Sequence, residues 1–355
     1  MDRGYERSTR SSRARARPLH PTLTTIAEAV GVSRQTVSNI LNAPHKVQPE
    51  TRARVEAEIA RQGYRPNRSA RSLRMRQTHF LGYCVPPPTS AGNPVMDRFL
   101  HAVTEAAERR GYHVVLFTQP LDGAGPRSAY EALLGQRAVD GFVLSDTTVG
   151  DQRQPWLRQR RIPFAAFGRR FAEPEIGSWV DVDGAAGIAT AVRHVASLGH
   201  RRLAFVGWPA GSGVGDDRCR GFVETAAALG LDVAAVERSE DVTGGGRRIS
   251  RDLLARPEAP TAIVCVSDVL AFGCDAAARE AGLVPGRDIA ITGFDDSPAA
   301  GLAAVSLTTV RQPLDVAGEQ VVRLLVEQLA DPDAADEQIL LEPTLVIRGS
   351  SDPQH

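Results

Sequence analysis

The chain has 355 residues, of which 42% are hydrophobic, and its 42 basic residues balance 42 acidic ones. This length allows several domains with buried cores, and no apolar run is long enough for a secretory signal or a membrane span. The four cysteines show no CxxC spacing, and His194 and His200 have no partners at metal-ligand spacing. We therefore expect reduced thiols, no metal or cofactor, and a cytoplasmic location.

The overall neutrality of the chain conceals a strong asymmetry of charge. Residues 1–77 hold 16 basic and 6 acidic side chains, a net charge of +10, whereas residues 78–355 hold 26 basic and 36 acidic side chains, a net charge of −10. A positive head on a negative body suits a phosphate contact made by the head alone. Residues 1–20 are rich in Arg and Ser and are expected to be a disordered arm, which either contacts DNA or is a solvated tail.

The stretch LTTIAEAVGVSRQTVSNILN, from Leu23 to Asn42, predicts two short helices folded about Gly31. Apolar residues at helical spacing form an inward stripe on both helices, and Ser33 is a natural N-cap for the second. The outward face of the second helix carries polar residues: Arg34, Gln35, Thr36, Ser38 and Asn39. Such a face fits a major groove, where Arg pairs with guanine and Gln or Asn pairs with adenine.

A third helix is predicted from Pro49, with Val55 and Ile59 on one face, and it ends at Gly63. Three helices over residues 21–64 can close a small core. The following residues, 65–77, are basic and contain a single large aliphatic residue, Leu73. This composition predicts a linker between the DNA-binding head and the larger body.

The head and linker together resemble the LacI family of transcriptional regulators. The motif residues that match are Val32, Ser33, Gln35, Thr36, Val37, Ser38, Tyr64, Pro66, Asn67, Arg68, Ala70 and Leu73. The resemblance implies that residues 65–77 become a hinge helix on operator DNA and that Leu73 wedges into the minor groove and kinks it. The expected DNA-binding residues are Thr24, Ser33, Arg34, Gln35, Thr36, Ser38, Asn39, Lys46, Tyr64, Asn67, Arg68, Ala70 and Leu73.

From Phe80 onward, short apolar runs alternate with helical stretches, which predicts parallel strands covered by helices. Two doubly wound parallel sheets are expected after the all-α helix-turn-helix domain. The resemblance implies a periplasmic-binding-protein-like body with crossovers near Asp181, Val310 and Glu337. Its N-subdomain is expected over residues 78–181 and 311–336, its C-subdomain over residues 182–310 and 337–350, and a tail over residues 351–355.

Ligands of open α/β sheets bind beyond the carboxyl ends of the strands, and these positions are polar in this chain. Each polar residue there either binds an effector or caps a strand end. The expected effector-binding residues, several of them assigned by the resemblance, are Ser145, Arg169, Trp179, Asp183, Arg218, Ser267, Asp295 and Gln312. Trp179 and Trp208 either stack on a sugar ring or pack in the core.

The sequence lacks a GxSxG motif, a Walker lysine and a recognisable pair of catalytic carboxylates, so no enzyme is predicted. The expected function is a homodimeric repressor of sugar uptake or catabolism genes, released from a palindromic operator by a sugar inducer. The strings WVDVDG and GWPAGSGVGDDR resemble glucoside- and cellodextrin-responsive regulators, which favours a disaccharide or a glucoside. A sugar-binding transport component and a corepressor-activated, purine-type regulator are the alternatives. No leucine heptads follow the strand expected at Leu345–Arg348, so a dimer rather than a tetramer is expected.

Overall fold

A computed structural model describes residues 21–64, 77–85, 94–119, 126–173, 175–302, 306–352 and 354. The chain divides into two compact units, residues 1–76 and residues 77–355. The expected arm, residues 1–20, and nearly all of the expected hinge lie outside the described residues, together with Asn67, Arg68, Ala70 and Leu73. Within the described part of the chain, no helix has the length and apolarity needed to cross a membrane.

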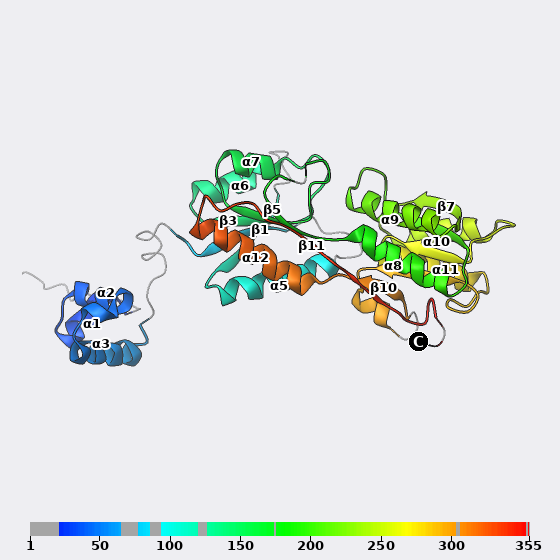
Figure 1. Cartoon of the computed structure of the whole chain (residues 1–355). Coiled ribbons are helices and arrows are strands. Elements are labelled where there is room, and N and C mark those ends of the chain that lie inside the picture. The colour runs from blue at the N-terminus through cyan, green and yellow to red at the C-terminus, as the bar shows by residue number, and fades with distance from the viewer. Residues whose placement is uncertain are drawn as a thin grey trace, which may run out of the picture. The chain divides into compact units, whose positions relative to one another are not determined.

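The first unit contains the three predicted helices, α1 (Leu23–Val30), α2 (Arg34–Asn42) and α3 (Pro49–Gln62), with a short 3₁₀ turn, Pro44–Lys46, after α2 (Figure 1). Local chemistry sets their ends. Ser33 caps α2 by accepting a hydrogen bond from the backbone N–H of Thr36 at 3.0 Å. Gly31 and Gly63 adopt left-handed φ angles of 75° and 63°, which end α1 and α3.

The first sheet of the second unit has six parallel strands in the order β11-β5-β4-β3-β1-β2. The strands are β1 (Phe80–Cys84), β2 (His113–Phe117), β3 (Gly141–Leu144), β4 (Phe164–Phe167), β5 (Ser178–Val182) and β11 (Gln338–Leu341). Helices α5 (Pro94–Arg109) and α12 (Leu314–Ala330) pack side by side on one face (Figure 1). Helices α6 (Pro126–Gly135) and α7 (Arg153–Gln159) cover the other face around a separate core.

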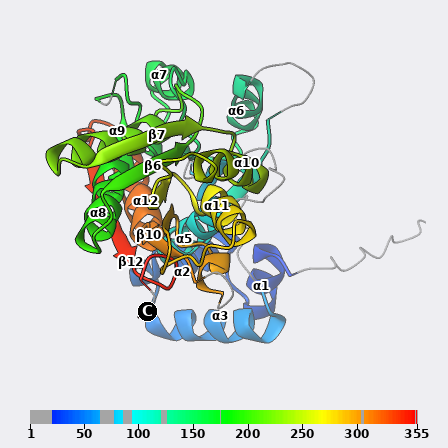
Figure 2. The ribbon, with the colours of Figure 1, turned by 90° about the vertical axis from the view of Figure 1, so that its right-hand side faces the viewer.

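The second sheet also has six strands, in the order β12-β10-β9-β8-β6-β7. They are β6 (Arg202–Gly207), β7 (Asp232–Arg238), β8 (Ala262–Cys265), β9 (Ala290–Phe294), β10 (Thr308–Arg311) and β12 (Thr344–Val346). Helix α8 (Gly184–Ser197) packs on α9 (Val214–Ala228), and α10 (Thr243–Leu254) packs on α11 (Asp268–Glu280) (Figure 2). A 3₁₀ turn, Pro298–Gly301, follows β9. The sheet is parallel except at its edge, where β12 runs antiparallel to β10.

The chain crosses between the sheets after β5, after β10 and after β11, so two of the three crossovers lie where they are expected. The third is displaced from Glu337, because Gln338–Leu341 pairs with β5 and extends the first sheet before the chain crosses. The expected tail also begins too early. Ser351 is 2% exposed and its hydroxyl lies 2.6 Å from that of Thr308 and 2.8 Å from a ring nitrogen of His194. Ser351 therefore packs into the second subdomain.

Candidate functional site

Helix α2 presents a polar face whose side chains are partly occupied by one another. Arg34 and Gln35 are exposed, and the Gln35 side-chain amide donates a hydrogen bond to Asn39 Oδ1 at 2.9 Å. The Ser33 and Thr36 hydroxyls lie 2.8 Å apart at the cap of the helix. Of the other residues expected at DNA, Thr24 and Lys46 are also exposed. The exposed amide, guanidinium and ammonium groups can reach base edges and phosphates.

Tyr64 is the exception among the described residues expected at DNA. Its side chain is 8% exposed and packs with Ile26, Val37 and Val55 in the core of the first unit. The left-handed turn at Gly63 brings it there, because the Tyr64 N–H then bonds the Ile59 carbonyl at 3.0 Å. In this structure Tyr64 closes the three-helix core rather than joining the exposed face.

The second subdomain gathers three of the expected effector residues: Arg218 on α9, Asp295 after β9 and Gln312 after β10. Arg218 is 4% exposed, and its guanidinium carbon lies 3.6 Å from the Phe294 ring centre and 5.3 Å from that of Trp208. Its Nη1 donates to the Val266 carbonyl at 2.7 Å and lies 3.9 Å from Asp295 Oδ1. The Arg218 Nε and the Trp208 indole N–H are buried donors without a partner in the described structure. Both therefore remain available to a ligand.

Asp295 is held in an unusual conformation beside this arginine. Its φ angle is 116°, a region that side chains other than glycine rarely adopt, and its N–H bonds the Val310 carbonyl at 2.8 Å. The Gln312 amide donates to Asp295 Oδ1 at 2.7 Å. Burial raises the pKa of Asp295 to about 8, and burial raises the pKa of the nearby Asp268 to about 6. Asp295 and Gln312 thus orient each other toward polar ligand groups.

Arg169 connects the two subdomains. It follows β4 in the first subdomain, and its Nε lies 3.3 Å from Asp181 while its Nη2 lies 3.0 Å from Asp217 of α9 in the second. Its guanidinium also stacks on Phe171 at 4.6 Å, and the Phe171 ring occupies the space that a Cβ at Gly213 would need. The residue after Asp217 is Arg218, so this contact adjoins the cluster described above.

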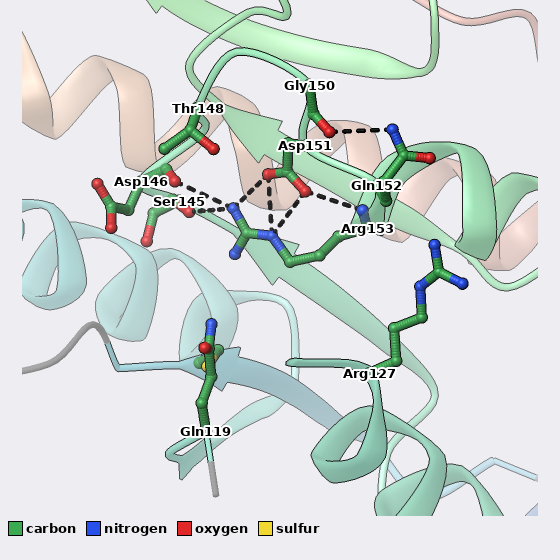
Figure 3. A pocket seen from close by; sticks show the side chains of 10 residues that line it. Gln119, Arg127, Ser145, Asp146, Thr148, Gly150, Asp151, Gln152 and Arg153 are labelled. Carbon is green, nitrogen blue, oxygen red and sulfur yellow. Dashed lines mark hydrogen bonds and ion pairs between the residues drawn. The ribbon is translucent and has the colours of Figure 1, made fainter. Parts of the chain in front are cut away.

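A cavity of about 350 Å³ opens at the carboxyl ends of β1 and β3 in the first subdomain (Figure 3). The Ser145 hydroxyl donates to the Tyr83 hydroxyl at 2.9 Å on its wall. Arg153 crosses the cavity, bonding Asp151 and the carbonyl oxygens of Ser145 and Asp146. The sequence prediction missed Asp151 and Arg153, because a loop of irregular conformation brings them to the strand ends and no periodicity marks it.

Two of the expected effector residues are also helix caps, and a third packs in the core. Asp183 caps α8 by accepting from the Ala186 N–H at 2.9 Å, and Ser267 caps α11 while donating its hydroxyl to Asp241. Trp179 lies near the amino end of β5, is 7% exposed, and packs in the core under α6 and α7. Core packing is therefore the correct alternative for Trp179, whereas Trp208 lies beside Arg218.

The arrangement combines a buried, stacked guanidinium with a carboxyl and an amide that orient each other. These groups can accept and donate several hydrogen bonds in a confined space, as recognition of a polyhydroxyl ligand requires. Among the described residues, no group of three or more His, Cys, Asp or Glu could hold a metal ion. The four cysteines are buried and free.

Comparison with known proteins assigns the family. Residues 22–67 match the model of bacterial regulatory proteins of the lacI family, and residues 192–351 match that of the periplasmic binding protein-like domain. The HTH-type transcriptional regulator MalR of Streptomyces coelicolor is 34% identical, over 93% of this chain and 96% of its own length. The chain belongs to the LacI family.

Solved structures agree with this assignment. The Lac repressor dimer bound to operator and the anti-inducer ONPF is 26% identical with a TM-score of 0.81, over 94% of this chain and 99% of that one. A complex of the transcriptional regulator CelR with cellobiose is 28% identical with a TM-score of 0.70, over 93% of this chain and 100% of that one. The predicted fold is confirmed, and this LacI-family protein is a DNA-binding transcriptional regulator, not an enzyme.

Proposed function

We propose that this LacI-family regulator represses genes for the uptake or breakdown of a sugar, and that a disaccharide or glucoside releases it from its operator. The carrying observation is the cluster of Arg218, Asp295 and Gln312, which places a buried guanidinium, a carboxyl and an amide at one set of strand ends. A relative of known structure, CelR, is described in complex with cellobiose. The alternative of a sugar transport component does not account for the helix-turn-helix unit.

We propose further that the protein works as a homodimer in the cytoplasm, on a palindromic operator. The Lac repressor relative is a dimer on its operator. One three-helix unit makes few contacts, whereas two units match the symmetry of two half-sites. Sedimentation of the full chain should give about twice the mass of one chain. A monomer that protects both half-sites without cooperativity would contradict this assembly.

The proposed response is a two-state coupling. Sugar bound at the strand ends favours one arrangement of the subdomains, and this arrangement disfavours the paired hinges on DNA. A ligand shifts such an equilibrium only by its difference in affinity for the two states, typically about 1 to 3 kcal/mol. Arg169 contacts both subdomains, so a change in their arrangement would alter its contacts.

The test is a titration of the full chain with mono- and disaccharides, measured by thermal unfolding and by operator binding. A sugar at a hundredfold its dissociation constant adds about 2.7 kcal/mol of stability. Arg218→Ala and Asp295→Ala should each weaken sugar binding by about 1 to 3 kcal/mol, because each leaves buried polar groups unpaired. Both variants should still bind operator. A sugar that tightens operator binding would identify a corepressor. Wild-type sugar affinity in both variants would place the effector elsewhere.

We also propose that α2 reads the operator and that Leu73 kinks it. Arg34→Ala should relax preference at one operator position by about 1 to 3 kcal/mol, since it removes a base contact. Leu73→Ala should reduce affinity and bending while sugar binding stays unchanged. An unchanged ranking of operator variants with Arg34→Ala, or an unchanged bend angle with Leu73→Ala, would refute the corresponding role.

A further inference from the structure

The region between the two subdomains is rich in carboxylates. Arg218 interacts electrostatically with Asp295, Asp181, Asp241 and Asp217, of which Asp181 and Asp217 also bind Arg169. Arg220 Nη2 also donates to Asp217 Oδ1 at 2.6 Å, so four carboxyl groups in this set face three guanidinium groups. Asp268 adds a further carboxyl that acts on Asp295.

The guanidinium groups of Arg169 and Arg218 are already engaged. Arg169 uses Nε and Nη2 on Asp181 and Asp217, and its face lies on Phe171. Arg218 Nη1 bonds the Val266 carbonyl, and its faces lie against Phe294 and Trp208. The positive charge of Arg169 is thus balanced by two carboxylates, whereas Arg218 Nε has no partner in the described structure.

The cavity of the first subdomain contains a paired cation, Arg153, and an exposed cation, Arg127. Arg153 is bound to Asp151 at 2.6 Å and to the carbonyl oxygens of Ser145 and Asp146 at 2.9 and 3.1 Å. Arg127 extends toward this cavity from the start of α6 and is an exposed cation on its rim (Figure 3). Arg127 is therefore the position at which an anionic ligand could find a counter-ion.

Additional negative charge is unfavourable at these strand ends. Burial already raises the pKa of Asp295 to about 8 and that of Asp268 to about 6, so the protein disfavours even its own carboxylates there. A phosphate or carboxylate on a ligand would add negative charge to a region in which Arg169 already has two carboxylate partners.

We propose that this cleft selects neutral sugars against phosphorylated or carboxylated ones, and that Asp181 and Asp217 enforce the selection by neutralising Arg169. This inference rests on the proposed sugar response and deepens it. The two aspartates determine specificity, because they bind Arg169 and so leave its positive charge unavailable to a charged group on the ligand.

The experiment compares matched sugars on the full chain, using cellobiose, maltose and trehalose against their 6-phosphates. Thermal unfolding and operator release report binding. Neutral sugars that bind should do so about a hundredfold more tightly than their phosphates, because juxtaposed like charges are strongly unfavourable. Phosphates that bind as tightly as the neutral sugars would overturn the inference and leave the proposed function standing. If no sugar of either class acts, the proposed function fails.

Variants of the two aspartates distinguish the exclusion of phosphorylated sugars by charge from their exclusion by size. Asp217→Asn removes a counter-ion that Arg169 shares with Arg220. It should narrow the ratio of the dissociation constants of phosphorylated and neutral sugar about tenfold. Asp181→Asn removes the other counter-ion of Arg169 and should narrow the same ratio independently. The control is Asp232→Asn at the amino end of β7, which removes an equal charge away from the cleft and should leave the ratio unchanged.

Two further outcomes are decisive. An unchanged ratio in both Asp217→Asn and Asp181→Asn would show that phosphates are excluded by size, which overturns the role of the aspartates. Phosphate binding that is lost in Arg127→Gln would show that the rim cation accepts anions, which also overturns the inference. Circular dichroism and operator binding verify that each variant is folded.

Discussion

Asp295 combines backbone strain, burial and a raised pKa in one residue. The hydrogen bond from its N–H to the Val310 carbonyl maintains its φ of 116°. Its side chain accepts a hydrogen bond from Gln312 and lies near Arg218. A carboxyl of unfolded chain ionises near pH 4, whereas in the folded protein its pKa is about 8. The folded state therefore binds one more proton between these values, and stability falls as pH rises through this window.

Asp295→Asn should reduce this loss of stability with pH. Asn keeps an acceptor for Gln312 and does not titrate. Between pH 6 and pH 8 the free energy of unfolding of the wild type should fall by about 1 to 2 kcal/mol more than that of the variant. This window reduces the contribution of Asp268, whose pKa is about 6, to the pH dependence. Thermal unfolding of both proteins at the two pH values measures the difference. If the stability of the two proteins changed with pH in parallel, Asp295 would be ionised over this whole pH range.

Ser33 shows how one residue can carry two roles. Its hydroxyl caps α2 through the Thr36 N–H, and the family resemblance also assigns it to DNA. Ser33→Ala should cost about 1 kcal/mol of helix stability and accelerate amide hydrogen exchange over residues 34–42. Ser33→Asp should retain the cap and the slow exchange while repelling phosphate. Equal exchange in the Ala variant and the wild type would contradict the capping role.

At the scale of elements, the tightest helix contact is made by glycines. A Cβ at Gly246 of α10 would overlap the carbonyl oxygen of Leu270, and one at Gly273 of α11 would overlap that of Thr243. The two helices therefore approach each other backbone to backbone. This closeness positions the start of α11, where Asp268 lies 2.5 Å from the Thr309 hydroxyl.

Gly246→Ala should destabilise the body by about 1 to 3 kcal/mol, because the new methyl group must push the helices apart. The matched control is Gly244→Ala on the same helix, where a Cβ would meet open space. That change should be neutral or stabilising by up to about 1 kcal/mol. Thermal unfolding of the two variants measures the contrast, and equal melting temperatures would refute the close packing.

At the scale of the whole molecule, Arg169 and Phe171 connect the subdomains. The guanidinium reaches Asp217, and the phenyl ring lies against Gly213, so the first subdomain contacts the second at the start of α9. These contacts therefore stabilise the arrangement of the two subdomains that the structure shows.

Arg169→Leu should loosen that arrangement and weaken sugar binding about three- to tenfold, because a smaller fraction of molecules is competent to bind. Small-angle scattering of the sugar-free protein distinguishes this effect from loss of a direct sugar contact, since only a loosened arrangement increases the radius of gyration. Phe171→Ala should act in the same direction. An unchanged radius in both variants would mean that the subdomains are held by other contacts.

The sequence alone determined the elements of this protein and the class of its function. The stripe of Ile26, Ala27 and Val30, the cap at Ser33 and the turn glycines predict the helix-turn-helix, because capping, backbone freedom and burial periodicity are local properties. Apolar runs alternating with helices predict the two sheets for the same reason. Asp295 and Gln312 were predicted as effector residues from their positions after strands together with the family resemblance, and Arg218 from the resemblance.

Tertiary structure alone decided the outcomes that depend on distant neighbours. Asp183 and Ser267 are helix caps as well as predicted effector residues, and Trp179 packs in a core with residues of α6 and α7. The pairing of β11 with β5, and of Arg169 with Asp217, joins segments that no local pattern relates. Local propensity acts over a few residues, whereas strand pairing and ion pairing depend on which surfaces the folded chain brings into contact.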